Sequence, residues 1–231
     1  MKKLRNILFV LALVLNAYVP AAAACAAILD LNFKIYSPAA LAAITFGVTL
    51  LALIFSFLCG SQSLLNKISA PVITLLSIAD FSVFLIFADD ATATVFCILT
   101  YAASVALAVK SFSFLLVKIL FPIVSTVLGV ATFLLSVILA LALALGNRSV
   151  TASSLSPDGR YRAEITSQSA ISKNGYSLII YDTENEVRLP FIRIFPDGEA
   201  IYSKSEIDPD GLSWENSNTV KVNGERFTVG D

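Results

Sequence analysis

Residues 139–161 read LALALALGNRSVTASSLSPDGRY, and the chain changes character within this stretch. The side chains are continuously apolar up to Gly146, whereas small polar and apolar residues alternate from Arg148 and a Pro-Asp-Gly turn signal follows at 157–159. A long apolar run is typical of a membrane-spanning helix, and short alternating segments between turns are typical of antiparallel strands. The stretch therefore predicts a boundary at residue 146. A membrane α-helical bundle (1–146) precedes it, and a small all-β antiparallel domain (147–231) follows.

The composition supports two regions that lie in different solvents. The 231 residues are 57% hydrophobic and 14% charged, well above the apolar content of soluble domains. Residues 1–145 contain seven Lys and Arg against four Asp and Glu, a net charge of +3, whereas residues 146–231 contain nine against thirteen, a net charge of −4. Because the chain is so apolar, membrane lipids are expected partners. Nucleic acid is not expected, because no basic run with interleaved aromatic residues is present.

Four or five transmembrane helices are predicted, because crossing ~30 Å of hydrocarbon at ~1.5 Å per residue takes about 20 apolar residues. The expected spans are 7–29, 39–59, 68–88, 91–109 and 119–145. Lys and Arg in short flanking segments stay in the cytoplasm. If the N-terminus is cytoplasmic, six basic residues fall on that side: Lys2, Lys3, Arg5, Lys67, Lys110 and Lys118. This pattern predicts a multi-pass protein of the cytoplasmic membrane with the C-terminal domain outside.

The first span has a competing interpretation as a secretory signal peptide. MKKLR, the apolar segment 7–19 and PAAAACAA have the order of its three regions, so residues 1–24 could be removed. Cys25 behind four alanines also resembles a lipoprotein processing site, although Ala22 stands where such sites usually have Leu. Apolar character continues to Leu29, which favours a retained helix. Cleavage would leave four spans and would not invert the others.

Strands are predicted where apolar and polar residues alternate: 148–153, 160–167, 176–182, 191–195, 199–203 and 219–223. Asn174-Gly175 and Asn223-Gly224 are hairpin signals, because a type I′ turn needs positive φ at both central residues. Pro-Asp-Gly recurs at 157–159, 196–198 and 209–211, where Pro presets a turn and Gly accepts the left-handed position after it.

Three specialised interpretations of the C-terminal domain were weighed. SPDG-x-Y and the 39 residues from Pro157 to Pro196 fit a propeller blade, but a propeller needs at least four blades and the domain has room for two. Asp208, Asp210 and Glu215 could offer oxygen ligands to a metal, although they do not follow the EF-hand pattern. Glu164 and Glu206 could act as an acid and base pair, but nothing in the sequence places them together. No cofactor is predicted.

Catalysis is disfavoured by the absence of histidine from the chain. Nucleophile activation by His, His general bases and His metal sites are all excluded with it. The three cysteines Cys25, Cys59 and Cys97 lie in apolar segments, so no disulfide framework is expected. The sequence therefore does not predict an enzyme.

Two motifs give the C-terminal part a family resemblance. Ser156-Pro157-Asp158-Gly159 with Tyr161 comes near the start, and Trp214 followed by Asn218-Thr219-Val220-Lys221-Val222-Asn223-Gly224 comes near the end. Together they resemble a family of small membrane-anchored proteins of Gram-positive bacteria that is known only as a domain of unknown function. The resemblance covers residues 150–229 and implies an extracytoplasmic β-rich module without assigned activity. Members usually have one N-terminal helix, so the multi-span part departs from the pattern.

Within the membrane region, Asp80 is the one acid in the interior of a predicted span. Intramembrane carboxylates are costly and indicate function by default. Asn16 and Tyr101 are expected within about one helical turn of its depth, and Ser77 one turn away on the same face. This candidate intramembrane polar site could be a hydrogen-bonded clasp between helices, which we favour, or an ion or proton site, or the wall of a water-filled vestibule. Pro71 and Pro122 are expected in first turns, where proline is tolerated.

The sequence thus predicts a polytopic anchor that displays a β-rich binding or structural module of the bacterial envelope. Its partner would be an envelope protein or other ligand that the residues do not identify. The alternative is a small transporter or channel component that uses Asp80.

Overall fold

The computed structural model describes residues 1–59, 64–88, 90–145, 148–170, 173–204 and 207–229. The chain divides into two compact units. The first, here called the helical unit, comprises Met1–Leu29, Phe33–Ala140 and Pro190–Ile192. The second, the β unit, comprises Asp30–Asn32, Leu141–Leu189 and Arg193–Asp231.

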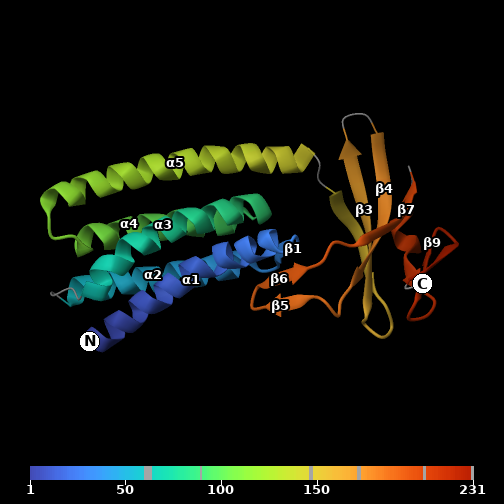
Figure 1. Cartoon of the computed structure of the whole chain (residues 1–231), viewed down its shortest axis with the longest axis horizontal. Coiled ribbons are helices and arrows are strands. Elements are labelled where there is room, and N and C mark those ends of the chain that lie inside the picture. Colours follow the sequence, from blue (N-terminus) through green and yellow to red (C-terminus); the bar gives the residue numbers. More distant parts are fainter. Residues whose placement is uncertain (60–63, 89, 146–147, 171–172, 205–206, 230–231) are drawn as a thin grey trace. The chain divides into compact units, whose positions relative to one another are not determined.

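Five helices dominate the first part of the chain (Figure 1). They are α1 (Lys2–Ile28), α2 (Pro38–Leu58), α3 (Leu64–Phe87), α4 (Ala91–Ser111) and α5 (Leu115–Leu145). Each is long and apolar enough to cross a membrane. With the antiparallel β region that follows, they confirm the predicted fold class of a helical bundle and a small all-β domain.

Small side chains let the first four helices approach closely. Ala12 of α1, Ala52 of α2 and Ala70 of α3 are fully buried in one apolar cluster. Small residues are the usual contact residues between helices in lipid, where close backbone approach replaces the hydrophobic driving force. Asp90 caps the start of α4, because its carboxylate accepts hydrogen bonds from the backbone N–H of Thr92 at 2.8 Å.

The helix starts correct one prediction. Because α3 begins at Leu64 and α5 at Leu115, Pro71 and Pro122 lie inside their helices and not in the first turns. Pro20 lies inside α1 in the same way. A proline cannot donate to the carbonyl four residues earlier, so each of these helices lacks one backbone hydrogen bond in its interior.

The structure brings the basic residues of the helices to one end of the bundle. Three contacts show this: Arg5 Nη1 donates to the Cys59 carbonyl at 3.0 Å, Lys67 Nζ donates to Ser113 Oγ at 3.2 Å, and Lys110 Nζ lies 4.8 Å from the ring centre of Phe57. The first contact joins the start of α1 to the end of α2. The second joins the start of α3 to the α4–α5 connection, and the third joins the end of α4 to the end of α2. We call this end, with Lys2, Lys3, Arg5, Lys67, Lys110 and Lys118, the basic end.

A short strand, β1 (Asn32–Ile35), follows α1, and the described residues after α5 form nine further strands. They are β2 (Arg148–Leu155), β3 (Tyr161–Ala170), β4 (Lys173–Asp182), β5 (Val187–Leu189), β6 (Ile192–Phe195), β7 (Glu199–Lys204), β8 (Ser213–Trp214), β9 (Thr219–Val222) and β10 (Glu225–Thr228), with a 3₁₀ turn, η1 (Pro209–Gly211), before β8. All six predicted strand segments contain a strand. The short strands β1, β5, β8 and β10 were not predicted.

The largest sheet has the strand order β2-β3-β4-β7, and β8, β9 and β10 form a second sheet. Ile165 pairs with Leu178 and Ala163 with Ile180, so these side chains share one face of the β3–β4 pair. This face packs against Val220 and its neighbours to form the core of the β unit. The alternation seen in the sequence therefore gives one apolar face, and Arg162 and Glu164 point to the other.

The turns agree with the sequence only in part. Asn223 and Gly224 have φ of 52° and 82° and form the expected hairpin turn. Asn174 and Gly175 instead pair with Ser169 and Gln168 inside the β3–β4 ladder, so the prediction of a turn there was wrong. The strand β4 already begins at Lys173, before these two residues. The β3–β4 connection at 171–172 lies outside the described residues.

Candidate functional site

The predicted intramembrane site lies in a layer of buried polar side chains from α1 to α4. We call it the polar layer, and its members are each at most 2% exposed: Asn16, Thr45, Thr49, Thr74, Ser77, Asp80, Cys97, Thr100 and Ser104. Direct contacts hold parts of it together, since Asn16 Nδ2 donates to Thr49 Oγ1 at 3.2 Å and the hydroxyls of Ser77 and Ser104 lie 3.1 Å apart.

The hydroxyl and amide donors of the polar layer are already used, and the Cys97 thiol is only a weak donor. Its Ser and Thr hydroxyls donate to backbone carbonyls of their own helices at 2.7–3.2 Å. The amide nitrogen of Asn16 also donates to the Ala12 carbonyl at 2.8 Å. Two acceptors are left over: Asp80 Oδ1 and Asn16 Oδ1 are buried without a hydrogen-bond partner among the described residues.

Tyr101, the fourth predicted member of this site, is directed elsewhere. Its hydroxyl lies 3.4 Å from both Ser125 Oγ and Thr126 Oγ1 of α5. Its side chain lines an apolar pocket of 250 Å³ between α3, α4 and α5, which includes Gly129. The structure thus brings Ser77 and Asn16 into the polar layer with Asp80, and it does not pair Tyr101 with Asp80.

An apolar layer separates the polar layer from the basic end. It consists of Leu8, Phe9, Ala12, Ala52, Ala70, Ile73, Leu107 and Ala108. The helices α1 and α3 start at the basic end, and their apolar-layer residues come before Asn16 and Ser77 in the chain. The helices α2 and α4 finish at the basic end, and their apolar-layer residues come after Thr49 and Ser104. In all four helices the apolar layer therefore lies between the polar layer and the basic end. Asp80 is therefore shielded from that side.

In the β unit, the Ser156–Tyr161 motif is a closed turn between β2 and β3. The Ser156 hydroxyl donates to Asp158 Oδ1 at 2.6 Å, and the same oxygen accepts the backbone N–H of Arg160 at 3.1 Å. These two hydrogen bonds lower the pKa of Asp158, and the bond from Ser156 has the larger effect. Gly159 has a φ of 74°, which suits glycine, and follows Pro157 in the turn. The residues of the motif therefore fix a turn.

The second motif also has a structural role. Trp214 packs against the core of the β unit, and its indole N–H donates to the Ser154 carbonyl at 3.2 Å. The side chain of Asn223 accepts the backbone N–H of Asp208 at 3.0 Å and so ties the β9–β10 turn to the segment before η1.

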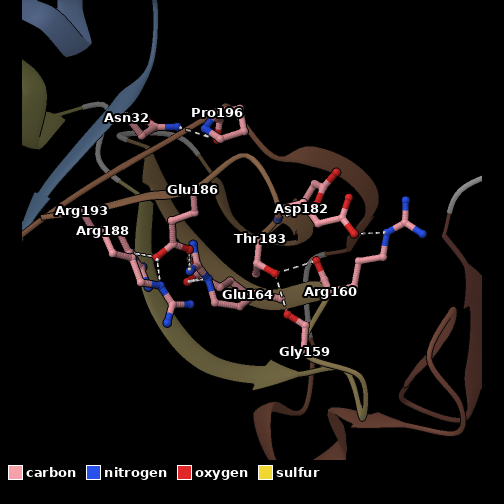
Figure 2. A network of polar contacts seen from close by, with 12 residues as sticks. Asn32, Gly159, Arg160, Glu164, Asp182, Thr183, Glu186, Arg188, Arg193 and Pro196 are labelled. Carbon is pink, nitrogen blue, oxygen red and sulfur yellow. Dashed lines mark hydrogen bonds and ion pairs between the residues drawn. The ribbon is translucent and has the colours of Figure 1, made fainter.

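A network of charged residues in the β unit was not predicted (Figure 2). Its centre is the carboxylate of Glu186, whose side chain is 1% exposed. Arg162 Nη1 lies 3.1 Å from one oxygen, and Arg188 Nε and Arg193 Nε lie 3.0 and 3.3 Å from the other. Arg162 Nε also lies 2.8 Å from Glu164 Oε1. Three guanidinium groups thus surround the Glu186 carboxylate, and one of them, that of Arg162, also pairs with the buried Glu164.

Aromatic rings complete the network. The guanidinium of Arg162 lies 4.9 Å from the ring centre of Tyr181 and 5.2 Å from that of Phe195, and Arg193 lies 5.0 Å from Phe195. Burial and the charge of Arg162 lower the pKa of Arg193, against the effect of Glu186. Removing one partner of a buried pair leaves the other charge unpaired and costs about 3–5 kcal/mol, so the intact network holds Glu186 against Arg162 of β3.

A surface pocket of 370 Å³ lies elsewhere in the β unit. Tyr161, Ile180 and Ile201 supply apolar walls, and three carboxylates line it: Asp182, Asp197 and Glu199. Its polar and apolar parts are balanced, and its residues come from four strands, β3, β4, β7 and β10, from the turn before β7 and from Val229 after β10. It is a recessed surface at which a ligand could be recognised.

Residues considered for metal binding or for an acid and base pair have other partners. Asp208 Oδ1 accepts the backbone N–H of Asp210 at 3.1 Å, and Glu215 pairs with Arg226 at 2.7 Å. Glu164 pairs with Arg162, while Glu206 lies outside the described residues. No group of three or more Cys, Asp or Glu suited to a metal occurs in the part of the chain that the structure describes.

Searches of protein-family models, curated proteins and solved structures find no match to this chain. The resemblance to the Gram-positive family therefore stays a hypothesis that rests on the two motifs.

Proposed function

We propose that the chain is a multi-pass membrane anchor that displays its β unit outside the cytoplasmic membrane as a binding or structural module. The carrying observation is the gathering of the six basic residues at one end of the bundle. Basic flanks stay cytoplasmic. An odd number of crossings then takes the chain to the opposite side after α5, where the β unit begins.

A binding role is supported by the surface pocket with Asp182, Asp197 and Glu199. A module with its own core can hold such a pocket in shape without the helices. The absence of histidine argues against a catalytic role for it. The proposed partner is an envelope protein or another ligand on the outer side of the cytoplasmic membrane.

Single cysteines in a cysteine-free background test both parts of the proposal. Asn185→Cys and Thr228→Cys are exposed positions in the β unit, and Thr228 lines the pocket. Ser113→Cys lies at the basic end and is the matched control. On intact cells, a membrane-impermeant maleimide should label Asn185→Cys, whereas Ser113→Cys should react only after permeabilisation. The opposite pattern would overturn the orientation.

The same variants test occupancy of the pocket. If a ligand is bound in cells, Thr228→Cys should label more slowly on cells than as purified protein, while Asn185→Cys should label equally in both. Equal rates at Thr228 would contradict a bound ligand there.

A second candidate function is that of a small transporter or channel component. It is favoured by one observation, the unpartnered Asp80 Oδ1 inside the bundle. Proton-driven or sodium-driven flux in reconstituted vesicles that Asp80→Asn abolishes would support it. Absence of any flux in the unmodified protein would count against it.

A further inference from the structure

The polar layer has more acceptors than donors. Asp80 Oδ1 and Asn16 Oδ1 are buried without a partner among the described residues, and Pro20 cannot supply the usual backbone donor to the Asn16 carbonyl. Unsatisfied polar groups cost several kcal/mol in a membrane interior, so such groups are normally paired. The layer therefore lacks a strong hydrogen-bond donor for these two oxygens, because the Cys97 thiol donates only weakly.

No basic side chain of the five described helices can supply it. Every Lys and Arg of the five helices belongs to the basic end, and the apolar layer lies between that end and Asp80. A carboxylate of 2% exposure without a cation beside it is strongly disfavoured.

The other ionisable groups near Asp80 do not place a positive charge beside its carboxyl group. Cys97 of α4 lies near it and is itself 2% exposed, and Tyr101 directs its hydroxyl toward α5. On α1, the Tyr18 hydroxyl donates to the Pro190 carbonyl at 2.7 Å. The only ionisable residue of α5 is Lys118, which belongs to the basic end.

We propose that Asp80 binds a proton inside the bundle and that the polar layer is its binding site. As a carboxylic acid, Asp80 itself becomes a hydrogen-bond donor, and the hydroxyl oxygens of the polar layer, which already donate to their own helices, keep lone pairs that can accept. A metal cation fits the site less well, because a metal needs several oxygens directed at one point. Proton binding is the step that the transport candidate requires, and it can be measured without any flux.

The experiment uses the full-length protein in membranes and the apolar reagent dicyclohexylcarbodiimide. A protonated carboxyl adds across one C=N bond, with its oxygen to carbon and its proton to nitrogen, and acyl transfer to nitrogen then gives a stable acylurea without loss of atoms. Peptide mapping locates the adduct. Asp90, the helix cap of α4, is an internal control in the same sample.

At about pH 7 an ordinary aspartate is protonated in about one molecule in a thousand, so Asp80 should carry at least about tenfold more adduct than Asp90. The adduct should fall as the pH rises and should be absent in Asp80→Asn. The infrared difference between the unmodified protein and Asp80→Asn should show the C=O band of a carboxylic acid.

Absence of both the excess adduct and the infrared band would overturn the proposal. Sodium that suppresses the adduct at constant pH, where potassium does not, would overturn it in favour of a metal-cation site. If Asp80→Asn does not accumulate, the comparison of Asp80 with Asp90 in the unmodified protein still decides. Labelling without flux would reject the transport candidate and leave proton binding in place.

Discussion

The glycines of the three Pro-Asp-Gly turns have different structural roles. Of the three Pro-Asp-Gly turns, only Gly159 has the positive φ expected from the sequence. Gly211 ends a 3₁₀ turn, and Gly198 has negligible room for a side chain, because a Cβ there would lie 2.7 Å from the Tyr181 ring. The expectation of a left-handed glycine was wrong at Gly198 and Gly211, since close packing cannot be seen in a local pattern.

Gly198→Ala should destabilise the β unit by about 1–3 kcal/mol, the usual cost of overpacking a core. The added methyl would meet Ile179 and Tyr181, and side chains on β4 would have to move. Trp214, the single tryptophan of the chain, reports unfolding of the β unit in the intact protein by fluorescence. Gly175→Ala is the matched control, with no atom within 4 Å of its Cβ. Equal midpoints for the two variants would contradict the packing argument.

At the scale of elements, the helices and long strands could be predicted and the Glu186 network could not. Continuous apolar runs and alternation are local signals, so α1–α5 and β2–β4 were visible in the sequence. Glu186 meets Arg162 from β3 and Arg193 from β6, which only the tertiary fold brings together. A partial signal was present, because Arg162 and Glu164 alternate with apolar Ala163 and Ile165 on a strand. Asp80 was predicted as a site because one acid in an apolar span stands out by itself.

The pair of Lys204 on β7 and Glu225 on β10 links two sheets, with Nζ and Oε1 2.6 Å apart. The hydrogen bond from Lys204 lowers the pKa of Glu225, and the bond to Glu225 raises the pKa of Lys204. A lowered carboxyl pKa stabilises the fold above its unfolded value of about 4.3, and a raised lysine pKa does so below about 10.4. The pair therefore contributes between these limits.

Glu225→Gln should lower the unfolding midpoint of the β unit at about pH 7, and the difference from the unmodified protein should shrink and then vanish as the pH falls through the lowered pKa of Glu225. Both groups are solvent-exposed, so the shift should be small. Trp214 fluorescence in denaturant measures it, with Lys204→Gln as the reciprocal variant. A difference that persists unchanged in acid would show that the ion pair is not its cause.

At the scale of the whole molecule, the division into two units separates the two functional proposals. Proton binding is proposed for the helical unit, and ligand recognition is proposed for the β unit. The fold class could be predicted because the apolar and alternating patterns meet at one point, near Gly146. The assignment of Pro190–Ile192 to the helical unit could not be predicted, because it depends on hydrogen bonds with residues more than 150 positions away.

Residues 148–231 expressed alone should fold cooperatively, because the core around Val220 is formed within them. Trp214 should keep a blue-shifted emission and lose it in one transition. Phe191 should behave differently. Its N–H donates to the Tyr36 hydroxyl at 2.9 Å, and its φ of 65° is unusual for a bulky residue. Without Tyr36, the Phe191 amide should exchange rapidly with solvent while the amides of β3 and β4 stay protected.

Hydrogen exchange measured by NMR on this fragment tests both expectations at once. Tyr36→Phe in the full-length protein is the matched variant, since it removes the acceptor hydroxyl and keeps the ring. It should speed exchange at Phe191 alone. A fragment with a random-coil spectrum would show that the β unit needs the helices to fold. Protection of Phe191 in the fragment equal to that in the full-length protein would show that this backbone conformation is set within the β5–β6 segment itself.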